Sequence, residues 1–111
     1  MTDFTLDDLA GIIATRARSG DPGSYTAKLV GAGVARCARK FGEEAIEATL
    51  AAVGEDDEAL TAEAADVLFL LLVILEARGI PLSSVMAELK QRTAQSGLAE
   101  KASRGGAADP A

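Results

Sequence analysis

A run of nine consecutive apolar residues, Val67–Leu75, constrains the fold of this chain more than any other feature. It lies in a segment, 57–78, that we expect to form a helix. Nine residues are too few to cross a bilayer, which takes about 20, so we predict no membrane partner. A helix that is apolar on every side is normally buried, and a chain of 111 residues can scarcely surround one. We therefore expect this helix to be central and to take part in a dimer interface.

The rest of the chain also has the apolar spacing and the capping residues of helices. Besides 57–78, the expected helices cover about 6–18, 24–33, 34–53 and 82–94. No segment has the pattern of a convincing strand, and we find no repeat. The predicted fold is therefore all-α, with four or five helices in one domain over 1–104 and a disordered tail at 105–111.

We make one prediction for each of two small residues in the expected 34–53 helix, Gly42 and Cys37. Gly42 costs a helix about 1 kcal/mol relative to Ala, which suggests that another group approaches the backbone there. Cys37 is expected to be a small apolar core residue. It is the only Cys and cannot form an intramolecular disulfide, and the N-terminus lacks a secretory pattern, so we expect a reduced, cytoplasmic protein.

The chain contains no His, and this excludes several kinds of chemistry. There can be no Ser-His or Cys-His nucleophile pair and no imidazole metal ligand. Any catalysis must use carboxylates, amines, hydroxyls or a metal ion held by oxygen ligands.

Charge is strongly segregated along the chain. The segment 41–77 holds ten acidic residues and no basic one, whereas the other 74 residues hold seven acids and all eleven bases. The net charge of −6 disfavours nucleic-acid binding unless a metal ion intervenes. Four of the bases lie just before the acidic segment: Lys28, Arg36, Arg39 and Lys40.

Two pairs of acids are spaced three residues apart on expected helices: Glu44 with Glu47, and Glu63 with Asp66. Residues at i and i+3 share a helix face. If the two helices pack antiparallel across the bend at Gly54, the pairs lie at similar heights and four carboxylates can converge. Such a group must be protonated, separated or neutralised by cations, and in a chain without His its oxygen ligands favour Mg²⁺ or Mn²⁺ over iron or zinc.

An ordinary solvated acidic surface is the alternative interpretation of these acids. Two observations weigh against it: the segment lacks the basic partners that surface helices usually carry, and its second acid pair directly precedes the apolar run. The bases also have two interpretations. They recognise phosphate beside a metal site, or they form i, i+4 ion pairs, Arg39 with Glu43 and Lys40 with Glu44.

Five segments carry a resemblance: SYTAKL at 24–29, Gly33 with Arg36, KFGEEAIE at 40–47, EAAD at 63–66 and RTAQSGLAEKASR at 92–104. Together they resemble the phosphoribosyl-ATP pyrophosphohydrolase family of histidine biosynthesis, over about 4–104. The spacing of the acids is also that of the broader all-α nucleoside triphosphate pyrophosphohydrolase (MazG-like) superfamily, whereas the flanking motifs indicate the narrower family.

The resemblance implies a homodimeric helical bundle that hydrolyses 1-(5-phosphoribosyl)-ATP to 1-(5-phosphoribosyl)-AMP and pyrophosphate with Mg²⁺. A metal-bound water would attack at the α–β phosphoanhydride while Lys and Arg stabilise the phosphates. By position, the metal ligands would be Glu44, Glu47, Glu63 and Asp66. The catalytic acids would be Glu43, Glu44 and Glu47. The substrate-binding residues would be Tyr25, Lys28, Arg36 and Lys40.

The sequence departs from the family pattern after Asp66. Many relatives have Tyr-His at the positions of Phe69 and Leu70. We expect both residues to be apolar packing positions without a polar role. Tyr25 has the same alternative, since it can equally be a packing residue.

Two other functions stay open at this point. A housekeeping hydrolase of free nucleotides, such as dNTPs, would keep the chemistry and change the substrate. A non-catalytic helical adaptor would use the apolar run to bind a partner and would take up no divalent ion.

Overall fold

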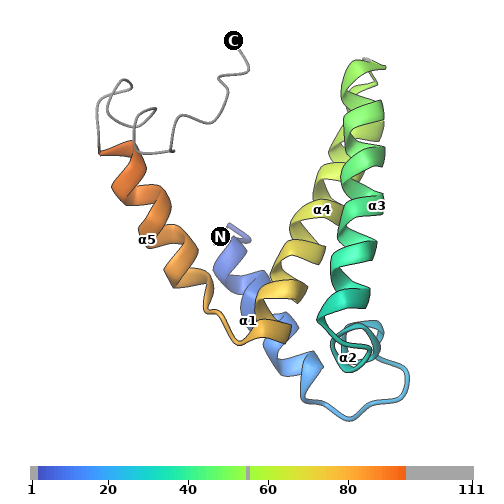
Figure 1. Ribbon diagram of the computed structural model, residues 1–111, viewed down its shortest axis with the longest axis vertical. Helices are drawn as coiled ribbons and strands as arrows, with labels where there is room; N and C mark the ends of the chain where they lie inside the picture. The colour runs from blue at the N-terminus through green and yellow to red at the C-terminus, as the bar shows by residue number, and fades with distance from the viewer. Residues whose placement is uncertain (1–2, 55, 95–111) are drawn as a thin grey trace. The chain divides into compact units, whose positions relative to one another are not determined.

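The computed structural model describes residues 3–54 and 56–94. These ranges contain five helices and no strand, which confirms the all-α prediction (Figure 1): α1 (Leu6–Ala17), α2 (Tyr25–Gly31), α3 (Val34–Val53), α4 (Asp57–Arg78) and α5 (Leu82–Thr93). The predicted tail at 105–111 lies outside the described residues. The chain divides into a first unit up to Ile80, with α1 to α4, and a second unit from Pro81, with α5.

Side chains cap the N-termini of three helices. At α1, Thr5 Oγ1 accepts the Asp8 backbone N–H at 3.1 Å while Asp8 Oδ2 accepts the Thr5 N–H at 3.0 Å. Ser24 and Asp56 cap α2 and α4 in the same way, each accepting a backbone N–H at 3.1 Å. These bonds satisfy donors that a helix end otherwise leaves unpaired. At its other end, α4 stops at Gly79, whose φ of +70° is a left-handed conformation that favours glycine.

The helices α3 and α4 lie side by side and run in opposite directions (Figure 1). In the first unit α4 also packs against α1 and α2, so the prediction of a central position is confirmed for the described part of that unit. The buried apolar residues are Ile13, Leu29, Cys37, Leu70, Leu72 and Val73. The 57–78 segment therefore contributes half of this core.

Cys37 is fully buried, as expected for a small core residue. Its Sγ–H donates to the carbonyl oxygen of Leu29 at 3.1 Å, which ties α3 to α2. Burial raises the pKa of the Cys37 thiol, because the thiolate would lose its hydration. Cys37 is therefore a protonated packing residue.

The prediction of a close approach at Gly42 is wrong for the described residues. A Cβ at this position would meet no heavy atom within 4 Å. Ile46, one turn further along the same side of α3, is 62% exposed. This side of the helix therefore faces away from α4.

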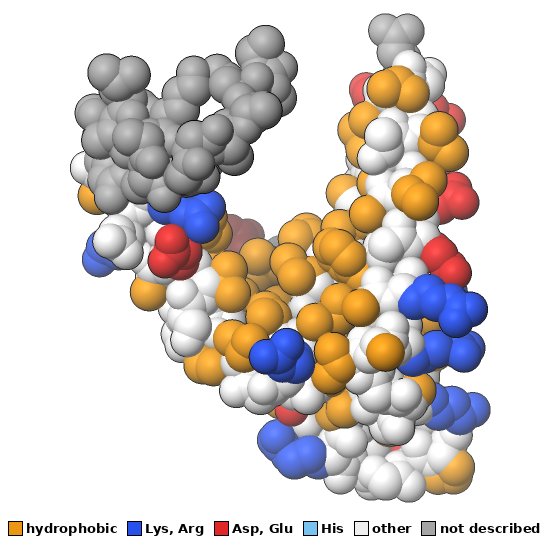
Figure 2. All heavy atoms as spheres, viewed as in Figure 1, with side chains coloured by type: hydrophobic (Ala, Val, Ile, Leu, Met, Phe, Trp, Pro, Cys, Tyr) orange, Lys and Arg blue, Asp and Glu red, His pale blue; other side chains and the backbone are white. Residues whose placement is uncertain are grey.

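The first unit leaves a large apolar area uncovered. The exposed apolar side chains of the α3–α4 hairpin include Ile46, Leu50, Val53, Leu68 and Leu71. Figure 2 shows hydrophobic side chains at the surface of the α3–α4 hairpin. Among the described helices, none combines the length and the apolar character needed to span a membrane.

Candidate metal centre

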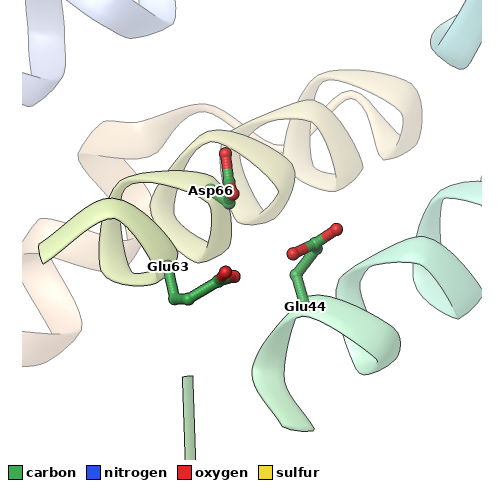
Figure 3. A group of neighbouring side chains, drawn as sticks. All are labelled: Glu44, Glu63 and Asp66. Atoms are coloured by element: carbon green, nitrogen blue, oxygen red, sulfur yellow. The ribbon is translucent and has the colours of Figure 1, made fainter. Parts of the chain in front are cut away.

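Three carboxylates meet across the α3–α4 hairpin (Figure 3). Glu44 comes from α3, and Glu63 and Asp66 come from α4; one oxygen of each lies within 4.8 Å of the other two. The i, i+3 spacing puts the α4 pair on one face, and the antiparallel packing of α3 brings Glu44 opposite to it. The predicted convergence is therefore present for three of the four acids.

Glu63 is distinguished from the other two acids by a buried carboxylate oxygen. It is half-buried, and its Oε2 is buried without a hydrogen-bond partner among the described residues. Loss of hydration raises the pKa of Glu63, and the Glu44 carboxylate, followed by the charges of Asp66 and Glu47, raises it further. A buried acceptor without a partner is unfavourable, and a bound cation would supply the partner. An all-oxygen group of this kind fits a hard divalent ion such as Mg²⁺.

Glu47 does not belong to the three-acid group. Its side chain is exposed, although it lies close enough for its charge to contribute to the raised pKa of Glu63. Glu47 therefore acts on the group electrostatically, at the side open to solvent.

Two of the expected basic residues pair with acids one turn further on α3. Lys40 Nζ lies 3.9 Å from Glu44 Oε1, and Arg39 Nε lies 4.0 Å from Glu43 Oε2. The i, i+4 pairing is thus present, at the long limit of an ion pair. Figure 2 shows the basic and acidic side chains in succession along the α3 side.

Arg36, Arg39, Lys40 and Glu43 line a small cavity of about 150 Å³. Three of its four lining residues are cations, so it suits an anion. Glu43 therefore lies with the bases and is not a member of the three-acid group.

A second small cavity, of about 120 Å³, adjoins the acids and is lined by Tyr25, Lys40, Glu44, Asp66, Phe69 and Leu70. The rings of Tyr25 and Phe69 stack, with centroids 6.3 Å apart and planes 13° apart. Tyr25 and Lys40 are thus placed beside the acids. Lys28 is exposed on α2; within the described ranges it forms no ion pair with the acids and does not line this cavity.

The expectation for Leu70 as a packing residue is confirmed, since only 3% of it is exposed. Phe69 packs as well, through its stack on Tyr25, but it also lines the cavity at the acids. Sequence reasoning missed this role, because an apolar residue inside an apolar run gives no signal of its own.

A larger cavity, of about 450 Å³, shares the Tyr25 and Phe69 rings and is otherwise lined by the end of α1 and the loop before α2. Its polar side chains include Arg16, Ser19 and Asp21. This site could not be predicted from the sequence, because these residues lie about 50 positions away from Phe69.

Known proteins are similar to this chain over nearly its whole length. A family model described as phosphoribosyl-ATP pyrophosphohydrolase matches residues 6–93. The phosphoribosyl-ATP pyrophosphatase of Rhizobium meliloti (strain 1021) is 56% identical over 104 residues, which cover 94% of this chain and 97% of that protein. Its counterpart in Methylobacterium nodulans is 59% identical with the same coverage. That of Rhizobium rhizogenes (strain K84) is 56% identical, over 94% of this chain and all of the relative.

Proposed function

Since the chain belongs to the phosphoribosyl-ATP pyrophosphohydrolase family, we propose that it hydrolyses 1-(5-phosphoribosyl)-ATP to 1-(5-phosphoribosyl)-AMP and pyrophosphate in histidine biosynthesis. The observation that carries the proposal is the meeting of Glu44, Glu63 and Asp66 within 4.8 Å, beside Lys40. Carboxylates repel a polyphosphate, but a cation bound between them and the phosphate oxygens would allow the substrate to approach.

We propose Mg²⁺ as the ion, with Mn²⁺ as a substitute. Glu44, Glu63 and Asp66 would hold it, and the unpartnered Oε2 of Glu63 would gain the contact that it lacks. A divalent ion in this place would neutralise phosphate oxygens and make a water molecule easier to deprotonate. We propose Glu47 as a fourth ligand. Its side chain is exposed and would reach the ion after a change of rotamer.

The other residues would act on the substrate and on the attacking water. Lys40 is placed to bind phosphate oxygens, because it lines the cavity at the acids and its contact with Glu44 is long. Arg36 would extend this cationic side, and Lys28 would join it on α2. Glu47 is the acid proposed to accept the proton of the attacking water, and Glu43 would assist in orienting it.

We also propose that the protein is a homodimer. Ile46, Leu50 and Val53 of α3 are each at least 60% exposed, which is unfavourable for large apolar side chains in water. In the second unit, Met86 and Leu89 on α5 are about half exposed as well. A second copy of the chain would cover such surfaces. We also propose a cytoplasmic location, because a chain without an intramolecular disulfide suits a reducing compartment.

A substrate panel tests the proposal. The purified protein is incubated with phosphoribosyl-ATP and, separately, with each dNTP, in Mg²⁺ or in EDTA, and pyrophosphate is measured. We expect rapid release from phosphoribosyl-ATP in Mg²⁺ and little from the dNTPs. Faster release from a dNTP would support the housekeeping hydrolase instead, and no release from any substrate would support the adaptor.

A further inference from the structure

The cavity of about 450 Å³ at the end of α1 has the size of a small-molecule site. Its walls come from three parts of the first unit: Arg16 on α1, the loop with Ser19 and Asp21, and the Tyr25 and Phe69 rings. The loop is held in place by its own hydrogen bonds. Ser19 Oγ donates to the Arg16 carbonyl oxygen at 2.9 Å and accepts the Asp21 N–H at 3.2 Å. The cavity is therefore part of the folded structure of this unit.

This cavity adjoins the proposed metal centre. Tyr25 and Phe69 line both it and the smaller cavity that contains Glu44 and Asp66. A ligand whose phosphates lie at the acids can therefore extend past this aromatic pair toward Arg16. Tyr25 is 53% exposed, so its ring also offers a face on which a purine can stack.

Arg16 gives the cavity a guanidinium that forms no ion pair with the described residues. Within the described residues no carboxylate oxygen lies within 4.0 Å of its guanidinium, whereas Arg18, two positions further, pairs with Glu76 at 4.0 Å. A guanidinium binds phosphate oxygens through two parallel N–H groups. Arg16 is thus available for a monophosphate.

Asp21 supplies a complementary acceptor. Its Oδ1 accepts the Gly23 N–H at 2.9 Å, and its Oδ2 has no partner among the described residues. A carboxylate repels a phosphate but accepts hydrogen bonds from the hydroxyls of a sugar. A cavity with Arg16 and Asp21 therefore suits a ribose phosphate better than a free anion.

Phosphoribosyl-ATP has this arrangement of groups. A triphosphate lies at one end, a second ribose with a monophosphate lies at the other, and adenine joins them. We propose that the cavity binds this second ribose phosphate, that Arg16 contacts its phosphate, and that Arg16 thereby distinguishes phosphoribosyl-ATP from ATP. The inference rests on the proposed function and adds to it a residue that sets specificity.

The test compares Arg16→Ala and Arg16→Lys with a matched variant, Arg18→Ala, which removes the same charge two residues away. Phosphoribosyl-ATP turnover is measured for each, together with inhibition by phosphoribosyl-AMP and by AMP. Loss of a charge-assisted hydrogen bond is expected to raise KM and the inhibition constant of phosphoribosyl-AMP by about tenfold to a hundredfold in Arg16→Ala. Arg16→Lys should recover part of the loss, because it keeps the charge without the planar fork.

AMP lacks the second phosphate. The ratio of the inhibition constants of AMP and phosphoribosyl-AMP should therefore be smaller in Arg16→Ala than in the wild type. Arg18→Ala should keep the wild-type ratio. Equal discrimination in wild type and Arg16→Ala would overturn the inference, as would an equal loss in Arg18→Ala. If melting curves show that Arg16→Ala does not fold, Arg16→Lys decides: discrimination equal to that of wild type then overturns it. Absence of turnover by the wild type would overturn the proposed function itself.

Discussion

The two ends of the α3–α4 hairpin differ in what surrounds them. At the end where α3 begins and α4 finishes, α1 and α2 lie beside the hairpin (Figure 1), and Cys37 and Val73 are fully buried. At the bend, Leu50 and Val53 are 60% and 75% exposed. The acids Glu44 and Glu63 lie between these ends. The covered end thus has a packed core, whereas the bend end exposes apolar side chains that the proposed second copy of the chain would cover.

The acids provide the largest expected effect. We expect Asp66→Asn to lower kcat/KM for phosphoribosyl-ATP by about a thousandfold, since a metal ligand supplies several kcal/mol of transition-state stabilisation. The control is Glu58→Gln, which removes a charge from the same helix at an exposed position. Steady-state kinetics in Mg²⁺ measure both variants. Equal rates for Asp66→Asn and wild type would remove the acids from the reaction.

A charge at the bend end tests whether that surface associates. Leu50→Asp is expected to weaken dimerisation by about a hundredfold or more, because burying a carboxylate in an apolar interface is costly. Sedimentation velocity over a range of concentrations measures the change. Thr15→Asp, an equally charged change at an exposed position on α1, serves as the control. A wild type that stays monomeric at every concentration would contradict the proposed dimer.

Truncation of one valine at each end sharpens the comparison. Val73→Ala should lower the free energy of unfolding by about 2–3 kcal/mol, because it removes two buried methyl groups and leaves a cavity. Val53→Ala should change it by less than about 0.5 kcal/mol, because that side chain is already in water. Urea unfolding is measured in the Leu50→Asp background and at low protein concentration, so that association contributes little. Equal losses at the two positions would show that the ends do not differ in packing.

The smallest expected effect is the pH dependence of stability without metal. The pKa of Glu63 is raised in the folded protein, so the fold binds a proton more tightly there than the unfolded chain does. This contribution is fully present below the ordinary pKa of a glutamate and is lost as the pH rises through the raised one. In EDTA, a small rise of the melting temperature is therefore expected on acidification through this window. Glu63→Gln should remove that part of the rise, and an unchanged profile in this variant would contradict the assignment.

Features that depend on neighbouring residues could be predicted from the sequence. Helix ends follow from local caps such as Thr5 and Gly79, and the pairing of Glu63 with Asp66 follows from their spacing. The antiparallel packing that adds Glu44 followed from the short connection between two long helices. Such features are set by backbone geometry within a few turns.

Features that depend on distant residues could not be predicted. The spacing of Glu47 is right for the acid group, yet its side chain points to solvent, because helix rotation decides which of two acids one turn apart faces the partner helix. The prediction at Gly42 was wrong for the same reason. The cavity at Arg16 needs residues from α1, a loop and α4, and only the folded chain brings these together.

Divalent-ion binding shows whether Glu44, Glu63 and Asp66 hold a cation between the two ends of the hairpin. The measurement is a calorimetric titration with Mn²⁺ of the wild type, Glu63→Gln and the exposed control Glu58→Gln. We predict saturable uptake by the wild type and the control, and a loss of affinity of about tenfold or more in Glu63→Gln. The same isotherm in Glu63→Gln as in wild type, or no uptake by wild type, would show that these acids do not form a metal site.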